Sequence, residues 1–243
     1  MELTDVEAQA YLELSEQIAV LSLAGGGLDE DSMDDIRLKT LLMKRARIIG
    51  SAAEKLDALE SALASRQPQP LTLFYCGDGS TEDEDTGDSI RQIDLVCELL
   101  YEKGWKCARF TARESREERE TLLNAFKVGA IDALVAIRCL DEGIDVPACR
   151  SAYILASSRN PKQFIQRRGR ILRRSAGKAA ATIYDFLVRL PLPEGKTSQT
   201  ERNLVRSELA RVAEFANLAR NSRDAAGMLL PLLREYDLAH LLV

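Results

Sequence analysis

The sequence predicts an α/β protein whose core is a parallel β-sheet. From Leu71 to Phe186, short apolar runs alternate with helical patterns, and this alternation is typical of strand–helix–strand units. The patterns on either side of this region are purely helical. With 243 residues, of which 46% are hydrophobic and 29% charged, the chain is long enough for one full domain with helical additions. We therefore expect one doubly wound domain between two helical segments.

Five strands and two intervening helices are expected within the α/β region. The helices are predicted at 89–103 and 115–128, and the second begins with the capping-box pattern Ser115-Arg116-Glu117-Glu118. The acidic stretch from Asp78 to Asp88, between the first strand and the first helix, is predicted to be a solvated loop. The strands are predicted at 71–76, 106–110, 131–137, 151–156 and 180–186.

Helices are expected on both sides of this region. The first begins with the capping-box pattern Thr4-Asp5-Val6-Glu7 and ends before the glycines at 25–27. A second, long helix is expected from Ser32 to Gln67, because leucine or isoleucine recurs every seven residues along it. The predicted domains are an N-terminal helical segment and inter-domain connection at 1–69, an α/β domain at 70–190 and a C-terminal helical extension at 191–243.

The charge distribution is strongly asymmetric. The net charge of -5 argues against a protein that coats nucleic acid nonspecifically, because such proteins carry a basic excess. Between Asp145 and Asp185, however, there is no acidic residue, so an anionic partner is expected near this segment. Its basic residues are Arg150, Arg159, Lys162, Arg167, Arg168, Arg170, Arg173, Arg174 and Lys178.

Cysteine usage and hydropathy predict a reduced, intracellular protein. The five cysteines form no CxxC pair, and we expect them to be buried, inert thiols. The single histidine, His240, is not expected to bind a metal, and no metal site is predicted in this chain. Since no stretch approaches the roughly 20 apolar residues of a membrane span and the first residues do not resemble a signal peptide, a cytoplasmic protein without membrane contact is expected.

The segment with the most chemical information runs from Phe164 to Arg173. If it is helical, Phe164, Ile165, Ile171 and Leu172 gather on one side, while Gln166, Arg170 and Arg173 lie on the other. Guanidinium groups on a rigid element can neutralise the charge that develops on a phosphoryl group during its transfer. An ordinary solvated basic face gives the same pattern, so the residues alone leave both interpretations open.

This segment resembles motif VI of the superfamily 2 helicases. The resemblance lies in Gln166-Arg167-Arg168-Gly169-Arg170-Ile171-Leu172-Arg173. It implies that Arg170 and Arg173 are arginine fingers that act on ATP, and that Gln166 lies near the terminal phosphate. Leu172 stands where the family commonly has glycine, as it does in the helicases of restriction and repair systems.

Two further segments resemble motifs of the same superfamily. The stretch from Ala133 to Pro147 resembles motif V, which implies that Gly143 approaches the nucleotide and that Asp145 hydrogen-bonds the ribose. The stretch from Leu71 to Cys76 resembles motif IV. Thr111 and Arg138 are the candidates for contact with the nucleic-acid backbone, since each follows a predicted strand.

Together the motifs span roughly residues 70 to 190 and resemble the C-terminal, second RecA-like domain of a superfamily 2 DNA helicase or translocase of the restriction and excision-repair branch. The resemblance implies an ATP-dependent motor in DNA repair, restriction or defence, with DNA favoured over RNA as partner. Alternatively, the chain is a non-catalytic module, derived from a helicase domain, that binds nucleic acid or a partner protein.

The sequence lacks two motifs that a complete motor needs, the phosphate-binding GxxxxGK[ST] loop and the acidic magnesium motif. Gly195-Lys196-Thr197 does not supply the loop, because Leu190 stands in place of its first glycine. We therefore expect ATP and Mg²⁺ to be held mainly by an N-terminal motor domain in the same chain or in a separate one.

The chain alone is accordingly expected to hydrolyse no ATP above background, even with saturating DNA, since it lacks the groups that bind the phosphates and the metal ion. Steady-state phosphate release from the purified chain measures this. DNA-stimulated turnover would show that the chain is a complete motor.

Overall fold

The structure is a computed structural model that describes six stretches of the chain and divides into two compact units. The described residues are 1–24, 33–82, 89–137, 149–156, 178–191 and 199–242. Unit 1 comprises Met1–Thr4 and Ala46–Val188, and unit 2 comprises Asp5–Arg45 and Arg189–Val243.

A five-stranded parallel sheet forms the centre of unit 1, with the strand order β4-β5-β1-β6-β7. Every residue of β5, β1 and β6 is buried, as expected for central parallel strands that are covered on both faces. All five strands predicted from the sequence are present. They are β1 Thr72–Tyr75, β4 Cys107–Phe110, β5 Ala133–Ala136, β6 Ser151–Ile154 and β7 Thr182–Asp185.

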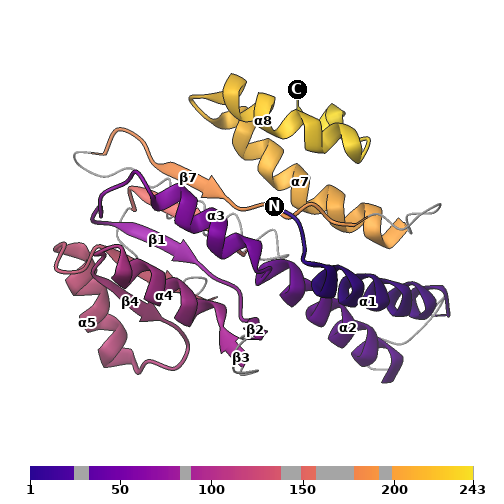
Figure 1. Cartoon of the computed structure of the whole chain (residues 1–243), viewed down its shortest axis with the longest axis horizontal. Helices are drawn as coiled ribbons and strands as arrows, with labels where there is room; N and C mark the ends of the chain where they lie inside the picture. Colours follow the sequence, from indigo (N-terminus) through magenta and orange to yellow (C-terminus); the bar gives the residue numbers. More distant parts are fainter. Residues whose placement is uncertain (25–32, 83–88, 138–148, 157–177, 192–198, 243) are drawn as a thin grey trace. The chain divides into compact units, whose positions relative to one another are not determined.

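Helices cover both faces of this sheet (Figure 1). α3 (Glu54–Leu63) and α4 (Gln92–Glu102) pack on one face, and α5 (Arg116–Lys127) packs on the other through Phe126. The predicted capping box of α5 is confirmed, because Ser115 Oγ accepts a hydrogen bond from Glu118 N at 3.2 Å and Ser115 N donates to Glu118 Oε2 at 2.7 Å. The α/β class with helices on both faces is therefore confirmed.

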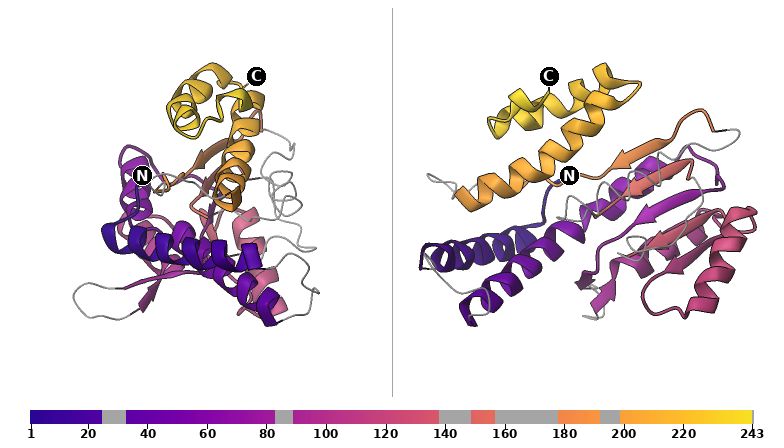
Figure 2. Two further views of the ribbon diagram at one scale, coloured as in Figure 1. Left: turned by 90° about the vertical axis from the view of Figure 1, so that its right-hand side faces the viewer. Right: turned by 180° about the vertical axis from the view of Figure 1, so that it is seen from behind.

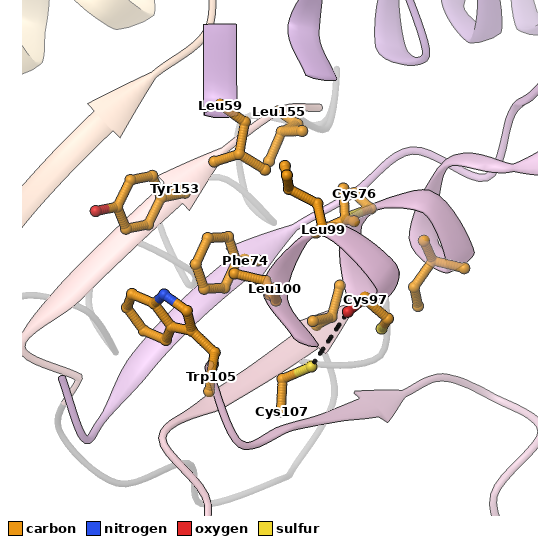
Figure 3. Packing of buried hydrophobic residues seen from close by; sticks show 14 of the residues in the cluster. Leu59, Phe74, Cys76, Cys97, Leu99, Leu100, Trp105, Cys107, Tyr153 and Leu155 are labelled. Atoms are coloured by element: carbon orange, nitrogen blue, oxygen red, sulfur yellow. Dashed lines mark hydrogen bonds between the residues drawn. The ribbon is translucent and has the colours of Figure 1, made fainter. Parts of the chain in front are cut away.

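Aromatic rings connect three neighbouring strands in the core beneath α3 and α4, and Figure 3 shows Phe74, Tyr153 and Trp105 among them. The Phe74 ring stacks on Tyr153 with a centroid separation of 4.7 Å and meets Trp105 edge to face at 5.6 Å. Tyr153 in turn stacks on Tyr184 at 4.5 Å. Phe74 pairs with Tyr153, and Tyr153 with Tyr184, in the strand register. This row of three stacked rings, called the aromatic ladder below, therefore stabilises the lateral order of β1, β6 and β7.

The cysteines of the described residues are buried free thiols, as predicted: Cys76, Cys97, Cys107 and Cys149. The Cys107 thiol donates to the backbone carbonyl oxygen of Cys97 at 3.8 Å, so it adds a weak contact between β4 and α4 (Figure 3). Cys139 lies outside the described residues.

The single long helix expected from Ser32 to Gln67 is wrong. The structure has α2 at Met33–Gly50 and α3 at Glu54–Leu63, with a break between them. Ser51 Oγ donates to the Arg47 carbonyl oxygen at 2.7 Å, and such a bond favours helix ends and bends. The seven-residue repeat of apolar residues continued across the break and concealed it.

The acidic stretch predicted to be a loop contains part of a short hairpin. β2 (Ser80–Glu82) pairs antiparallel with β3 (Ser89–Arg91), and α4 consequently begins at Gln92, three residues later than expected. The two strands were not predicted because a strand is recognised in a sequence by its run of apolar residues. Ile90 is the one apolar residue among their six positions. Residues 83–88 lie outside the described residues.

Unit 2 is helical. α1 (Asp5–Ala24), which confirms the first predicted helix, lies beside α2 in Figures 1 and 2, and the buried Arg45 donates from α2 to Ser15 Oγ on α1 at 3.0 Å. α7 (Gln199–Leu218) packs against α8 (Ser222–Glu235), which is followed by the 3₁₀ helix η1 (Ala239–Leu241). Within the described stretches, no helix is both long enough and apolar enough to cross a membrane.

Replacing Phe74 with alanine is expected to destabilise unit 1 by about 3–5 kcal/mol, because the truncation leaves a cavity between Trp105 and Tyr153. Trp105, the only tryptophan and a buried one, reports unfolding in urea through its fluorescence. As a control, Val128→Ala, at a side chain that is 78% exposed, should change the unfolding free energy by less than about 0.5 kcal/mol. Equal effects of the two variants would exclude the aromatic ladder as a major source of stability.

Candidate functional site

The carboxyl ends of the five strands lie at one edge of the sheet because all five strands are parallel. The segment 138–148 directly follows the end of β5, and 157–177 follows the end of β6. These two strands flank β1 on either side. Open parallel sheets bind ligands at this edge, so it is the candidate site of the chain.

Six of the seven residues predicted to act at this edge lie outside the described residues: Arg138, Gly143, Asp145, Gln166, Arg170 and Arg173. The described strands nevertheless show where the two segments begin. Ile137, one residue before Arg138, is buried at the end of β5, and Ala156 follows the buried Leu155 at the end of β6.

Thr111, the seventh predicted residue, directly follows β4 at the same edge. It is 5% exposed, and its hydrogen bonds are made locally. Its backbone N–H and its hydroxyl both donate to Glu114 Oε2, at 2.5 and 2.8 Å, while Oγ1 accepts from Arg113 N at 3.1 Å. In this arrangement the Glu114 carboxylate accepts hydrogen bonds from both donors of Thr111.

The corner between α2 and α3 is held against the ends of β1 and β6 by two buried polar side chains that sequence reasoning missed. Gln92 Oε1 accepts from Gly77 N at 2.7 Å, and Gln92 Nε2 donates to the Gly50 carbonyl oxygen at 2.9 Å. Lys55, which is 2% exposed, donates through Nζ to the carbonyl oxygen of Leu155. Both side chains therefore satisfy backbone groups at the site edge.

Close backbone approach at this corner requires glycine at position 79. A Cβ atom there would lie 2.4 Å from Ser51 Oγ and 2.8 Å from Ser51 Cβ, which is too close for any side chain. The neighbouring ion pair between Arg47 and Asp78 spans 3.5 Å and is partly exposed, so solvent screens it and its contribution is small. The buried Gln92 and Lys55 side chains, more than this ion pair, therefore hold the corner.

Burial raises the pKa of two cysteines next to this sheet. Burial raises the pKa of Cys76, at the end of β1, far above its usual value, although the nearby Lys55 acts in the opposite direction. Burial likewise raises the pKa of Cys149, before β6, to about 12. Both thiols stay protonated near neutral pH, so they act as packing groups and not as nucleophiles.

A comparison of the sequence with known families supplies the identification. Residues 54–175, slightly more than half of the 243 residues, match the family described as the helicase conserved C-terminal domain. The chain belongs to this family. The match includes the segments that resemble motifs V and VI, and the parallel sheet is the RecA-like fold that those motifs imply. The resemblance to the second RecA-like domain of superfamily 2 helicases is thereby confirmed, whereas the restriction and repair branch has only loose support.

Curated relatives of this helicase C-terminal domain are longer proteins. The DNA 3'-5' translocase XPB2 of Sulfurisphaera tokodaii is 38% identical over 191 residues, which cover 73% of this chain and 39% of the translocase. The pre-mRNA-splicing ATP-dependent RNA helicase PRP28 of Cryptococcus neoformans is 28% identical over 222 residues, 79% of this chain and 28% of the helicase. The chain thus spans less than half the length of either relative.

Among solved structures, the Hef helicase domain of Pyrococcus furiosus aligns with 73% of this chain and 35% of its own length, with 22% sequence identity and a TM-score of 0.37.

The Gln92 bridge is open to a direct test. Gln92→Leu keeps the approximate size of the side chain but leaves the Gly77 N–H and the Gly50 carbonyl without their partner, so the unfolding free energy should fall by about 1–3 kcal/mol for each group left unsatisfied. Urea denaturation followed by Trp105 fluorescence measures the loss. Glu98→Leu, at an exposed position of the same helix, is the control and should be close to neutral. A Gln92 variant as stable as the control would contradict the bridging role.

Proposed function

We propose that this helicase C-terminal domain is the second motor domain of an ATP-dependent DNA helicase or translocase, and that it acts on ATP held by a first motor domain. The observation that carries the proposal is the order of the segments along the sheet. Gly143 and Asp145 follow β5, while Gln166, Arg170 and Arg173 follow β6, so both groups leave strands whose carboxyl ends share one edge. One bound nucleotide can then contact both segments.

Arg170 and Arg173 are assigned the role of arginine fingers. Their guanidinium groups remain protonated at all relevant pH values and present forked donors, which suit the oxygens of a terminal phosphate. When the two motor domains close on ATP, these donors would neutralise the charge that develops on the transferred phosphoryl group. Gln166 is assigned to the same phosphate, and Gly143 and Asp145 to the sugar side of the nucleotide.

The residues of this chain fit only part of an ATP–Mg²⁺ complex. The sequence has no GxxxxGK[ST] loop, and among the described residues no group of three histidine, cysteine, aspartate or glutamate side chains is placed to hold a metal ion. ATP would supply the free energy of phosphoryl transfer, while this chain would contribute donors and close the cleft. Binding of the metal ion and of most of the triphosphate is assigned to the other domain.

DNA is proposed as the nucleic-acid partner. The relative named as a DNA translocase is 38% identical to this chain, whereas the relative named as an RNA helicase is 28% identical. Leu172, in place of the glycine common in motif VI, is further support for a role in repair, restriction or defence. Thr111 and Arg138, which follow neighbouring strands β4 and β5, are assigned to the phosphates of the tracked strand.

In the two-domain protein, Arg170→Ala and Arg173→Ala should each reduce ATP turnover by about 10³- to 10⁵-fold, because arginine fingers act on the transition state. DNA binding and thermal stability should change little. Lysine should restore little activity at either position, since an ammonium group has the charge but not the forked donor geometry. Steady-state ATPase assays at saturating ATP and DNA measure the effect.

Arg168 provides the matched control for these variants. It has the same charge and lies in the same segment, but on a helix it projects toward the apolar side, so Arg168→Ala should affect stability more than chemistry. Turnover within about twofold of wild type in both finger variants would refute the assignment, because such a change corresponds to only about 0.4 kcal/mol. A two-domain protein that binds DNA but hydrolyses no ATP would favour the non-catalytic module.

A further inference from the structure

The hydrogen bonds of Thr111 point to an anion site that is filled from within the chain. Two donors of Thr111, its backbone N–H and its hydroxyl, converge on a single oxygen, Glu114 Oε2, at 2.5 and 2.8 Å. The hydroxyl has one hydrogen, and Arg113 N donates to its oxygen at 3.1 Å, so the hydroxyl proton is directed at Glu114. Convergent N–H and O–H donors of this kind suit a phosphate oxygen as well as a carboxylate oxygen.

The contact of Glu114 with Thr111 is not needed to cap the adjacent helix. The first turn of α5 has a complete capping box of its own, in which Ser115 Oγ accepts from Glu118 N and Glu118 Oε2 accepts from Ser115 N. Glu114 lies just before this box, and its side chain is partly exposed. Its carboxylate can therefore leave Thr111 for solvent without loss of the helix cap.

We propose that Glu114 competes with a nucleic-acid backbone phosphate for the donors of Thr111. The inference rests on the proposed function, in which Thr111 contacts the tracked strand. A phosphodiester binds at this position only by displacing the carboxylate, because two anions do not share the same two donors. Glu114 consequently weakens binding of the strand to this domain alone. A strand that is also held by other contacts, such as those of a first motor domain, displaces it more readily.

Replacing Glu114 with an uncharged residue of the same shape tests the competition between its carboxylate and a phosphate. Glu114→Gln keeps the shape and an oxygen that accepts from Thr111, so the local fold is retained, but it removes the negative charge and weakens the competing hydrogen bonds. Glu117→Gln is the matched control: it makes the same change in net charge three residues away, on an exposed position of α5. Circular dichroism and Trp105 fluorescence verify that each variant is folded.

Binding is measured with the full chain by fluorescence anisotropy, at low and at physiological ionic strength, using short single-stranded DNA and RNA oligonucleotides of the same sequence. Glu114→Gln should bind about 3- to 10-fold more tightly than wild type, as expected for the loss of one charge-assisted competitor, whereas Glu117→Gln should differ from wild type by less than about twofold because an exposed charge is screened. Adding Thr111→Val to Glu114→Gln should remove most of the gain, since the valine keeps the backbone N–H but lacks the hydroxyl, one of the two converging donors. Comparing the two oligonucleotides shows whether the affinity for DNA, for RNA or for both increases.

The outcomes distinguish failure of the proposed Glu114 competition from failure of the proposed nucleic-acid binding. If wild type binds an oligonucleotide and Glu114→Gln gains no more than Glu117→Gln, the competition is overturned while nucleic-acid binding stands. A gain that persists undiminished in the Thr111→Val double variant also overturns it, because the hydroxyl of Thr111 would then make no contribution to the gain. If neither wild type nor any variant binds either oligonucleotide, the nucleic-acid role fails, and the competition fails with it.

Discussion

Parallel pairing of the five strands in the order β4-β5-β1-β6-β7 buries the central strands on both faces. It also brings the carboxyl ends of all five strands to one edge of the sheet. Burial on both faces explains the layers. Leu73 and Tyr75 on β1 pack toward α5, while Phe74 between them packs toward α3 and α4. The shared edge explains the site, because residues far apart in the sequence follow strands that are neighbours in space.

Several backbone groups just beyond that edge are hydrogen-bonded to side chains, where the strand ladders stop. Gln92 is hydrogen-bonded to Gly77, just after β1, and to Gly50, at the end of α2. Lys55 donates to Leu155, just after β6. Glu114 serves Thr111 after β4. The edge therefore has polar contacts next to an apolar core, and a ligand that binds to these polar groups must replace an existing partner. The inferred competition at Thr111 is one instance of this constraint.

The sequence allowed the sheet to be predicted because each central strand is a short, largely apolar run and because the helix after Ser115 has its own start signal. It did not allow the break at Ser51 to be predicted, because the seven-residue apolar repeat crosses it and the tertiary approach of Gly79 has no local signature. Gln92 and Lys55 escaped notice for a related reason. Each is one of several polar residues in its amphipathic helix, and only the folded chain shows that this particular residue is buried. Gly143, Asp145, Gln166, Arg170 and Arg173 were predicted from motif order, and their roles remain predictions.

The proposed function requires that the segments 138–148 and 157–177 contact ATP that another domain holds. Hydrogen–deuterium exchange tests it most directly, on the two-domain protein with and without ADP–aluminium fluoride, which stands in for the transferred phosphoryl group. Exchange should be slower in peptides from both segments when the analogue and DNA are bound, and it should not change in this chain alone, because the chain lacks the GxxxxGK[ST] loop. Unchanged exchange of both segments in the two-domain protein, with the analogue demonstrably bound, would contradict it.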